Sequence, residues 1–196
     1  MAVPLMFQPL AKYAQFEGRS RRSEFWLWVL FRFIVSATMG VIAFAMLAPV
    51  FSAIAAQRNM DEAHSFALMA NVFRIYPLYM LVGLGLLVPT LAVAVRRLHD
   101  INRSGLWLLM PLGVAIGGLI LLVIAGVILA VSVGVAAHQG AQPTTAEGFA
   151  GIAGVFIAYI VYGLAVFAAE IVLFVFFVTE GSKGENRFGA DPKATI

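Results

Sequence analysis

Four long apolar runs dominate the sequence and restrict the environment in which it can fold. Each is long enough to cross a hydrocarbon core about 30 Å thick, which takes roughly 20 apolar residues in a helix. Only 12% of the residues are charged, whereas soluble domains average about 25%, so the chain has too few charges to cover a globular surface. The runs extend over residues 25–50, 74–95, 106–136 and 149–178.

These runs predict an all-α fold: a polytopic membrane helix bundle with four transmembrane helices in a single domain, residues 1–196. The segment 1–24 precedes the first span, and the segment 179–196 follows the last one. Within the second run, Pro77 and Pro89 predict bends, because neighbouring groups must satisfy the carbonyls that prolines free.

The N-terminal segment contains a short amphipathic stretch. Pro9 stands where a first helical turn would begin, and Gly18 stands just past the end of the pattern. We therefore expect an interfacial helix from Pro9 to Glu17.

Lys and Arg residues are concentrated on one side of the predicted bundle. That side comprises the N-terminal segment, the loop between the second and third runs, and the C-terminal segment. Because basic loops are retained in the cytoplasm, we expect both termini to be cytoplasmic. The ten basic residues of this side are Lys12, Arg19, Arg21, Arg22, Arg96, Arg97, Arg103, Lys183, Arg187 and Lys193, and the two on the opposite side are Arg58 and Arg74.

Three polar motifs fall on the expected cytoplasmic side. The first is GRSRRSEFW at residues 18–26, and the second is RRLHD at 96–100, continued by RSGLW at 103–107. The third is GENRFGADP at 184–192. Together the motifs resemble, in identity and order, the bacterial inner-membrane family of domain of unknown function 805. The resemblance implies a multi-pass protein of the bacterial inner membrane, and it brings no activity or catalytic residues. Typical members look shorter between the second and third motifs, with room for one span, whereas this chain has room for two.

The arginines of these motifs are the first candidate site. Arginine is favoured where a planar fork binds carboxylate or phosphate. Six acidic residues share the same side, so a structural salt-bridge network among the loops is the first interpretation. The alternative is a site that binds anionic lipid or a partner protein. Its candidate residues are Arg19, Arg22, Arg96, Arg97, Asp100, Arg103 and Arg187, and the six acids are Glu17, Glu24, Asp100, Glu180, Glu185 and Asp191.

Two charges inside the spans form the second candidate site. Arg32 and Glu170 each lie about eight residues from the cytoplasmic end of a span, which is roughly 12 Å deep. An isolated charge at such depth is costly, so we predict an Arg32–Glu170 ion pair between the first and fourth spans. Alternatively, Arg32 reaches back to the headgroups and Glu170 is protonated, or Glu170 is a proton or cation site in a transport path.

The function favoured by these patterns is a non-enzymatic inner-membrane module that binds anionic lipid or another membrane protein at its cytoplasmic face. The alternatives are a small transporter or channel using Arg32 and Glu170, and a membrane enzyme acting on a phosphate-bearing lipid through His99 or Asp100. We expect no catalytic residues, cofactor, metal or nucleic-acid partner. The expected partners are membrane lipids, and the glycines in the spans permit another membrane protein or a homo-oligomer.

Overall fold

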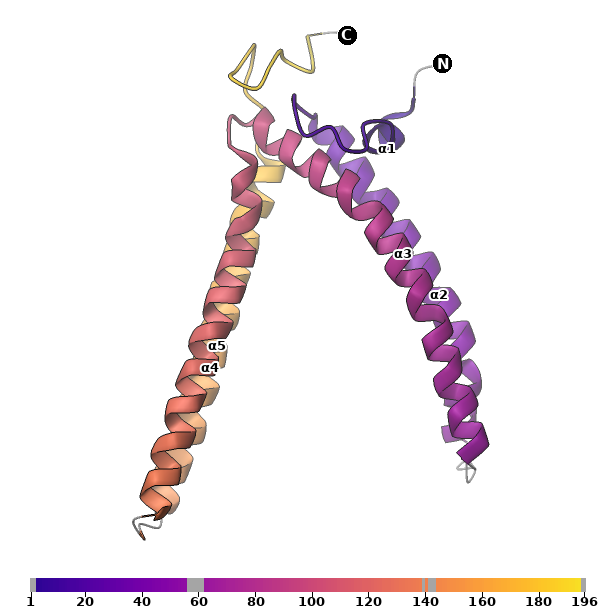
Figure 1. The fold of residues 1–196 in the computed structure, drawn as a ribbon. Coiled ribbons are helices and arrows are strands. Elements are labelled where there is room, and N and C mark those ends of the chain that lie inside the picture. The colour runs from indigo at the N-terminus through magenta and orange to yellow at the C-terminus, as the bar shows by residue number, and fades with distance from the viewer. Residues whose placement is uncertain (1–2, 56–61, 139, 141–143, 195–196) are drawn as a thin grey trace. The chain divides into compact units, whose positions relative to one another are not determined.

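The structure, a computed structural model, describes residues 3–55, 62–138, 140 and 144–194. Four long helices account for most of these residues (Figure 1). The chain divides into two compact units, of which unit 1 is Met1–Asn102 with Glu180–Ile196, and unit 2 is Arg103–Thr179. All four long helices contain apolar stretches of membrane-spanning length. The prediction of an all-α protein with four candidate spans is therefore confirmed.

Unit 1 is built on two antiparallel helices, α2 (Arg22–Ala55) and α3 (Glu62–Asp100). Their membrane-spanning stretches are Arg22–Pro49 and Tyr76–Asp100. A short 3-10 helix, η1 (Leu5–Phe7), and one turn of α-helix, α1 (Gln8–Ala11), pack across the start of α2 and against α3. The N-terminal segment with α1 thus lies at the end of this helix pair where α2 begins and α3 ends (Figure 1).

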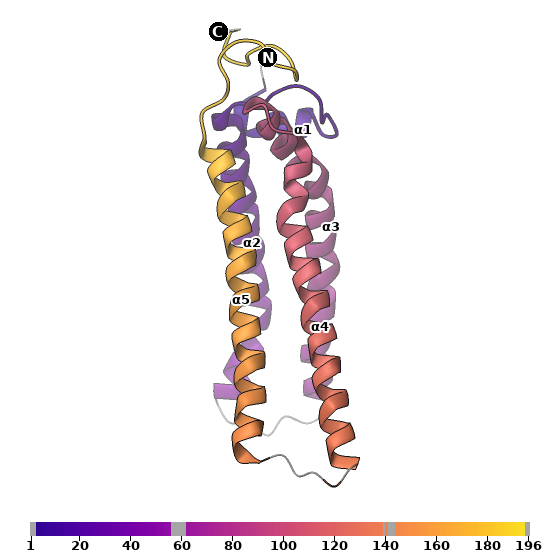
Figure 2. The ribbon, with the colours of Figure 1, turned by 90° about the vertical axis from the view of Figure 1, so that its left-hand side faces the viewer.

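Unit 2 is a second antiparallel pair, shown from the side in Figure 2. A 3-10 turn, η2 (Gly105–Leu108), leads into α4 (Leu109–His138), and α5 (Thr145–Val178) returns beside it. Their membrane-spanning stretches are Gly105–Ala136 and Ala153–Val178. Pro111 falls in the first turn of α4, where the missing N–H group has no intrahelical partner to lose.

The junction after α3 has local causes. Arg97 lies in its last turn, where a cation complements the negative end of the helix dipole. Asn102 then adopts a positive φ of 59°, and its N–H group donates to the carbonyl of His99 at 3.0 Å. Asparagine tolerates this left-handed conformation better than other residues with a Cβ atom, so the helix stops where the second motif turns.

The N-terminal segment is held to α3 through a proline. Pro89 has no N–H group, so the carbonyl of Gly85, four residues earlier, lacks its helical donor. The hydroxyl of Tyr13 donates to that carbonyl at 2.8 Å, and α3 curves along this part of its length (Figure 1). The expected interfacial helix from Pro9 to Glu17 is shorter than predicted, because the α-helix ends at Ala11 and the chain beyond it turns to reach α3.

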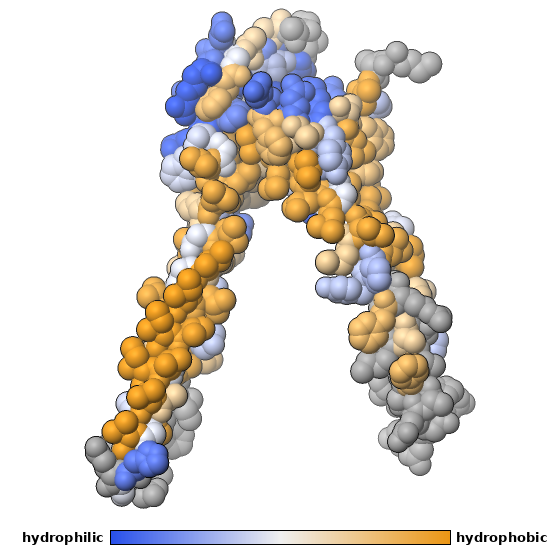
Figure 3. All heavy atoms as spheres, in the orientation of Figure 1, coloured by the Kyte–Doolittle hydropathy of each residue, from blue (hydrophilic) through white to orange (hydrophobic). Residues whose placement is uncertain are grey.

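Hydrophobic side chains cover the shafts of the helices, whereas hydrophilic residues gather at the end of unit 1 where α2 begins and α3 ends (Figure 3). We call this end the motif end. It comprises the segments 12–24, 96–102 and 180–193 and contains the first motif up to Glu24, the RRLHD part of the second and the whole third motif.

Candidate functional site

Asp100 is the centre of the motif end. Its carboxylate, in a residue that is 4% exposed, accepts a hydrogen bond from Nε of Arg19 at 3.0 Å and a second one from Nη1 of Arg97. The Arg19 and Arg97 side chains are almost completely buried. The carboxylate at the end of α3 therefore joins the first motif to the second, across 81 residues of sequence.

The C-terminal tail binds to the same centre. Its Ser182 donates through both its N–H group and its hydroxyl to the carbonyl oxygen of Asp100, at 2.8 and 3.0 Å. Arg19 donates in return to the carbonyls of Ser182 and Gly184, at 2.5 and 2.6 Å. All three motifs consequently meet around Asp100 and Arg19.

Gly181 explains how the tail comes so close to Asp100. A Cβ atom at this position would lie 2.6 Å from Cγ of Asp100. A separation under 3.0 Å requires the carboxylate to shift, and this carboxylate is fixed by two guanidinium groups. The position therefore has room only for glycine.

A third buried ion pair lies beside the two made by Asp100. Nη1 of Arg96 donates to Oε1 of Glu24 at 2.9 Å, with side-chain exposures of 1% and 5%. The backbone also connects the two segments here, because the N–H group of Ser20 donates to the carbonyl of Arg96 at 3.0 Å. Glu24 lies in the first turn of α2, where a carboxylate also complements the helix dipole.

The three buried ion pairs form one buried charge cluster of five residues, and its charges do not cancel. Three of its members are guanidinium groups and two are carboxylates. Nε and Nη2 of Arg96 and the hydroxyl of Ser20 are buried without a hydrogen-bond partner in the described part of the chain. The members of the cluster are Arg19, Arg96, Arg97, Glu24 and Asp100.

The third motif folds back on the end of α3. The ring of Phe188 stacks on His99 with 3.8 Å between centroids and 3° between planes. Nδ2 of Asn186 donates to the carbonyl of His99 at 3.0 Å. A tight turn from Asn186 to Gly189 closes with two reciprocal backbone hydrogen bonds, and it requires glycine at its end because Gly189 has a φ of 129°.

Asp191 fastens the remainder of the tail. Its carboxylate accepts from the N–H groups of Lys193 at 2.9 Å and of Gly184 at 3.1 Å. The hydrogen bond from Lys193 is the main reason that the pKa of Asp191 lies below its usual value, with that from Gly184 adding to the effect.

Two exposed ion pairs share Glu180 on the surface of unit 1. Glu180 contacts Lys193 at 3.3 Å and Arg22 at 3.4 Å. The hydrogen bond and charge of Lys193, followed by the charge of Arg22, hold the pKa of Glu180 below its usual value. Exposed pairs of this kind contribute little to stability.

The structure divides the predicted arginine site into three groups. Arg19, Arg96, Arg97 and Asp100 come together in the buried charge cluster. Arg22 and Arg187 lie on the exposed surface of unit 1, where Arg187 packs over Phe188 at 4.7 Å and donates to the carbonyl of Asn102.

Arg103 belongs to unit 2. Its guanidinium lies 5.1 Å from the ring centroid of Trp107 and 5.0 Å from that of Phe176. These cation–π contacts join the segment just before α4, which includes η2, to the end of α5.

The predicted intramembrane pair involves both units. Arg32 is on α2 of unit 1 and Glu170 is on α5 of unit 2. Both side chains are exposed on their helices. The Arg32–Glu170 ion pair stays a prediction.

The motif end contains a polar cavity of about 340 Å³. It lies between the N-terminal segment, the first turn of α2 and the tail. The residues that line the polar cavity are Leu5, Gln8, Lys12, Arg19, Arg21, Glu24 and Pro192.

Among the described residues, no group of three His, Asp or Glu side chains is arranged to hold a metal ion.

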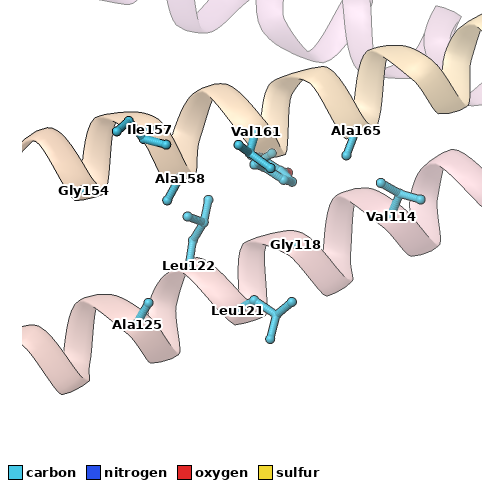
Figure 4. A pocket seen from close by; sticks show the side chains of 11 residues that line it. Val114, Gly118, Leu121, Leu122, Ala125, Gly154, Ile157, Ala158, Val161 and Ala165 are labelled. Atoms are coloured by element: carbon cyan, nitrogen blue, oxygen red, sulfur yellow. The ribbon is translucent and has the colours of Figure 1, made fainter.

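Unit 2 contains a cavity of another kind, about 590 Å³ in volume and lined by apolar and small residues of α4 and α5 (Figure 4). Gly118 lies at its middle, and a Cβ atom there would come within 2.6 Å of the Tyr162 ring. The Tyr162 hydroxyl donates to the carbonyl of Ala115 at 3.0 Å. This hydrogen bond holds α4 and α5 together. The other residues that line the cavity are apolar or glycine, so the lining offers no further polar side chain.

Sequence reasoning missed four contributors to the motif end. Lys12 and Arg21 were counted only as topogenic charges, although both line the polar cavity. Gly181 was not singled out, and no pattern in the sequence signals its closeness to Asp100. Tyr13 could have been found, because Pro89 predicts an unpaired carbonyl at Gly85 that needs a donor.

Comparison with known proteins identifies the family of this chain. The sequence model of the family described as "Protein of unknown function (DUF805)" matches residues 13–190. The chain belongs to the DUF805 family. The match begins at Tyr13 and ends just before Asp191, so it includes the first two motifs, the third motif up to Ala190, and most of both units.

Two relatives of this DUF805 chain are inner-membrane proteins of Escherichia coli (strain K12). Inner membrane protein YhaI is 28% identical over 184 residues, which cover 94% of this chain and 91% of YhaI. Inner membrane protein YhaH is 30% identical over 114 residues, which cover 58% of this chain and 77% of YhaH. No solved structure matches the chain.

These findings place the DUF805 chain in the inner membrane as a multi-pass protein.

Proposed function

We propose that this DUF805 protein is a non-enzymatic module of the inner membrane that binds anionic lipid at its motif end, and that this end faces the cytoplasm. The observation that carries the proposal is the excess of positive charge at the point where α2 and α3 leave their apolar stretches. The motif end contains nine Lys and Arg residues and six Asp and Glu residues.

The location of the cations supports lipid binding. The buried charge cluster occupies Arg19, Arg96 and Arg97, but other cations lie outside it. Each basic residue beside a membrane surface attracts anionic lipid by about 1 kcal/mol. The cations that we assign to lipid binding are Lys12, Arg21, Arg22 and Arg187.

The contacts of His99 and Asp100 support a non-enzymatic role. Both carboxylate oxygens of Asp100 accept from guanidinium groups, and its side chain is buried. The His99 ring is covered on one face by Phe188, and its Nδ1 contacts the carbonyl of Gly18 at 3.1 Å. These groups are occupied in holding the motifs together and leave no acid–base pair open to a substrate.

Tryptophan quenching by brominated lipids tests this function, because the chain has three tryptophans. The full-length protein would be reconstituted with increasing fractions of brominated phosphatidylglycerol or brominated phosphatidylcholine. We expect a higher association constant for phosphatidylglycerol, with the preference shrinking as salt screens the charges. Equal association constants at low salt would overturn the proposal.

A further inference from the structure

The polar cavity at the motif end has positive charge that the protein does not neutralise. Lys12 and Arg21 have no ion-pair partner among the described residues, and the one side-chain bond given for Arg21 goes from Nε to the carbonyl of Pro192 at 2.6 Å. The single carboxylate of the lining, Glu24, is already paired with Arg96 at 2.9 Å. An anion entering the cavity would thus meet two cations and no free carboxylate.

The buried charge cluster behind the lining is a second reason to expect an anion in the polar cavity. Arg19 and Glu24 belong to both the cavity lining and the buried charge cluster. That cluster has one more guanidinium than carboxylates, and Arg96 keeps two buried N–H groups without partners. A surplus charge in a poorly solvated place is unfavourable unless a counter-charge lies close by. An anion in the cavity would supply that counter-charge.

Apolar side chains lie beside the cavity and contact the membrane-spanning stretch of α2. Leu5 lines it, and the neighbouring Phe7 packs edge-to-face on Phe31 of α2 with 5.5 Å between ring centroids. Phe31 follows Glu24 by seven residues, which is about 10 Å farther along the helix. Phe7 and Leu10 also remain exposed. This order, with cations above an apolar wall, matches that of a phospholipid, whose phosphate lies above its acyl chains.

We propose that the polar cavity binds a phosphate-type anion, and that the phosphate is the headgroup of an anionic phospholipid. The inference rests on the proposed function and names its site. Arg21 offers its free guanidinium edge, Lys12 its ammonium group, and Gln8 its side-chain amide as a hydrogen-bond donor. The volume of about 340 Å³ falls in the range of about 300–1,000 Å³ that is usual for small-ligand sites.

The test compares two double variants of the full chain with equal loss of charge. Lys12→Gln with Arg21→Gln removes both free cations of the cavity, whereas Lys183→Gln with Lys193→Gln removes two cations of the tail outside it. In the brominated-lipid measurement we expect the cavity variant to lose about tenfold or more in its preference for phosphatidylglycerol, because each cation contributes roughly a factor of five. The tail variant should stay within about twofold of the unmodified protein.

A third variant guards against misfolding, since Gln8→Glu adds a negative charge to the cavity and removes no cation. It should also weaken phosphatidylglycerol binding. If the unmodified protein prefers phosphatidylglycerol but neither cavity variant loses that preference, this site is wrong while the proposed function stands. If the unmodified protein shows no preference, the proposed function itself has failed.

The source of the phosphate is distinguished by thermal unfolding of the protein in detergent. Inorganic phosphate and chloride would be compared at matched ionic strength. We expect phosphatidylglycerol to raise the unfolding temperature of the unmodified protein, and inorganic phosphate to leave it unchanged. Stabilisation by inorganic phosphate that disappears in the cavity variant, without any effect of phosphatidylglycerol, would assign the cavity to a soluble phosphate and overturn the lipid assignment.

Discussion

At the scale of single residues, Asp100 has the most interactions to lose. Its carboxylate is the counter-charge of Arg19 and Arg97, both almost completely buried. Asp100→Asn keeps the size of the side chain but leaves two guanidinium groups without a negative partner. Since breaking a buried pair costs about 3–5 kcal/mol, we expect a large loss of stability in thermal or denaturant unfolding of the detergent-solubilised protein.

The matched control for this prediction is Glu180→Gln. That substitution also removes one carboxylate with two cationic partners, Arg22 and Lys193, but on the exposed surface. Water screens this site, so the unfolding midpoint should hardly change. Equal effects of the two substitutions would show that the Asp100 cluster does not stabilise the fold.

The contribution of Asp191 to the stability of the folded tail depends on pH. Because its pKa is lowered in the folded protein, its contribution is complete above the usual aspartate value of about 3.9 and is lost as the pH falls through the lower, folded value. The amide resonance of Gly184, which donates to this carboxylate, should titrate with a midpoint below about 3.9. In Asp191→Asn this titration should be absent. A midpoint at or above the usual value would contradict the assignment.

At the scale of elements, Tyr13 and Pro89 should be energetically coupled. Tyr13→Phe removes the donor to the Gly85 carbonyl and should cost about 0.5–1.5 kcal/mol. In a Pro89→Ala background the new N–H group can bond to the same carbonyl, so the loss of the hydroxyl should cost less. A double-mutant cycle on unfolding free energies measures the difference, and strict additivity would show that the hydrogen bond does not depend on the proline.

Much of the element level could be predicted from the sequence. Length and hydropathy alone gave the four spans, because bilayer thickness sets the length of an apolar run. The helices extend beyond the predicted runs, as with α3, which begins at Glu62 rather than at Arg74. Hydropathy marks the apolar part of a helix, whereas hydrogen bonding continues it into polar sequence. The N-terminal helix was overestimated because the tertiary bond of Tyr13 outweighs local propensity there.

At the scale of the whole molecule, the partner of each charged residue was harder to predict than the presence of the charges. The motifs and their charges indicated a salt-bridge network, and the structure shows one. Which arginine meets which acid could not be inferred, because Arg19 and Asp100 are 81 residues apart and several equivalent charges compete for each partner. The polar cavity was missed because it combines three segments whose proximity exists only in the folded chain.

The Arg32–Glu170 pair is a prediction at this scale, since it would connect the two units. Arg32→Ala and Glu170→Ala should each destabilise the protein, because an uncompensated charge at this depth costs at least about 2.5–3.5 kcal/mol. The exchanged protein, Arg32→Glu with Glu170→Arg, should recover most of that loss. The measurement is the free energy of unfolding of each variant in detergent. If the exchange recovers nothing, the two side chains are not partners.

The central claim is that four spans carry the motif end on the cytoplasmic side, and thiol labelling tests it most directly because the chain contains no cysteine. Single cysteines at Glu185, on the exposed tail, and at His138, at the exposed end of α4, would be treated with a membrane-impermeant reagent in right-side-out and inside-out vesicles. We expect Glu185→Cys to react only from the cytoplasmic side and His138→Cys only from the opposite side. Reaction of both from the same side, or the reverse pattern, would contradict the account.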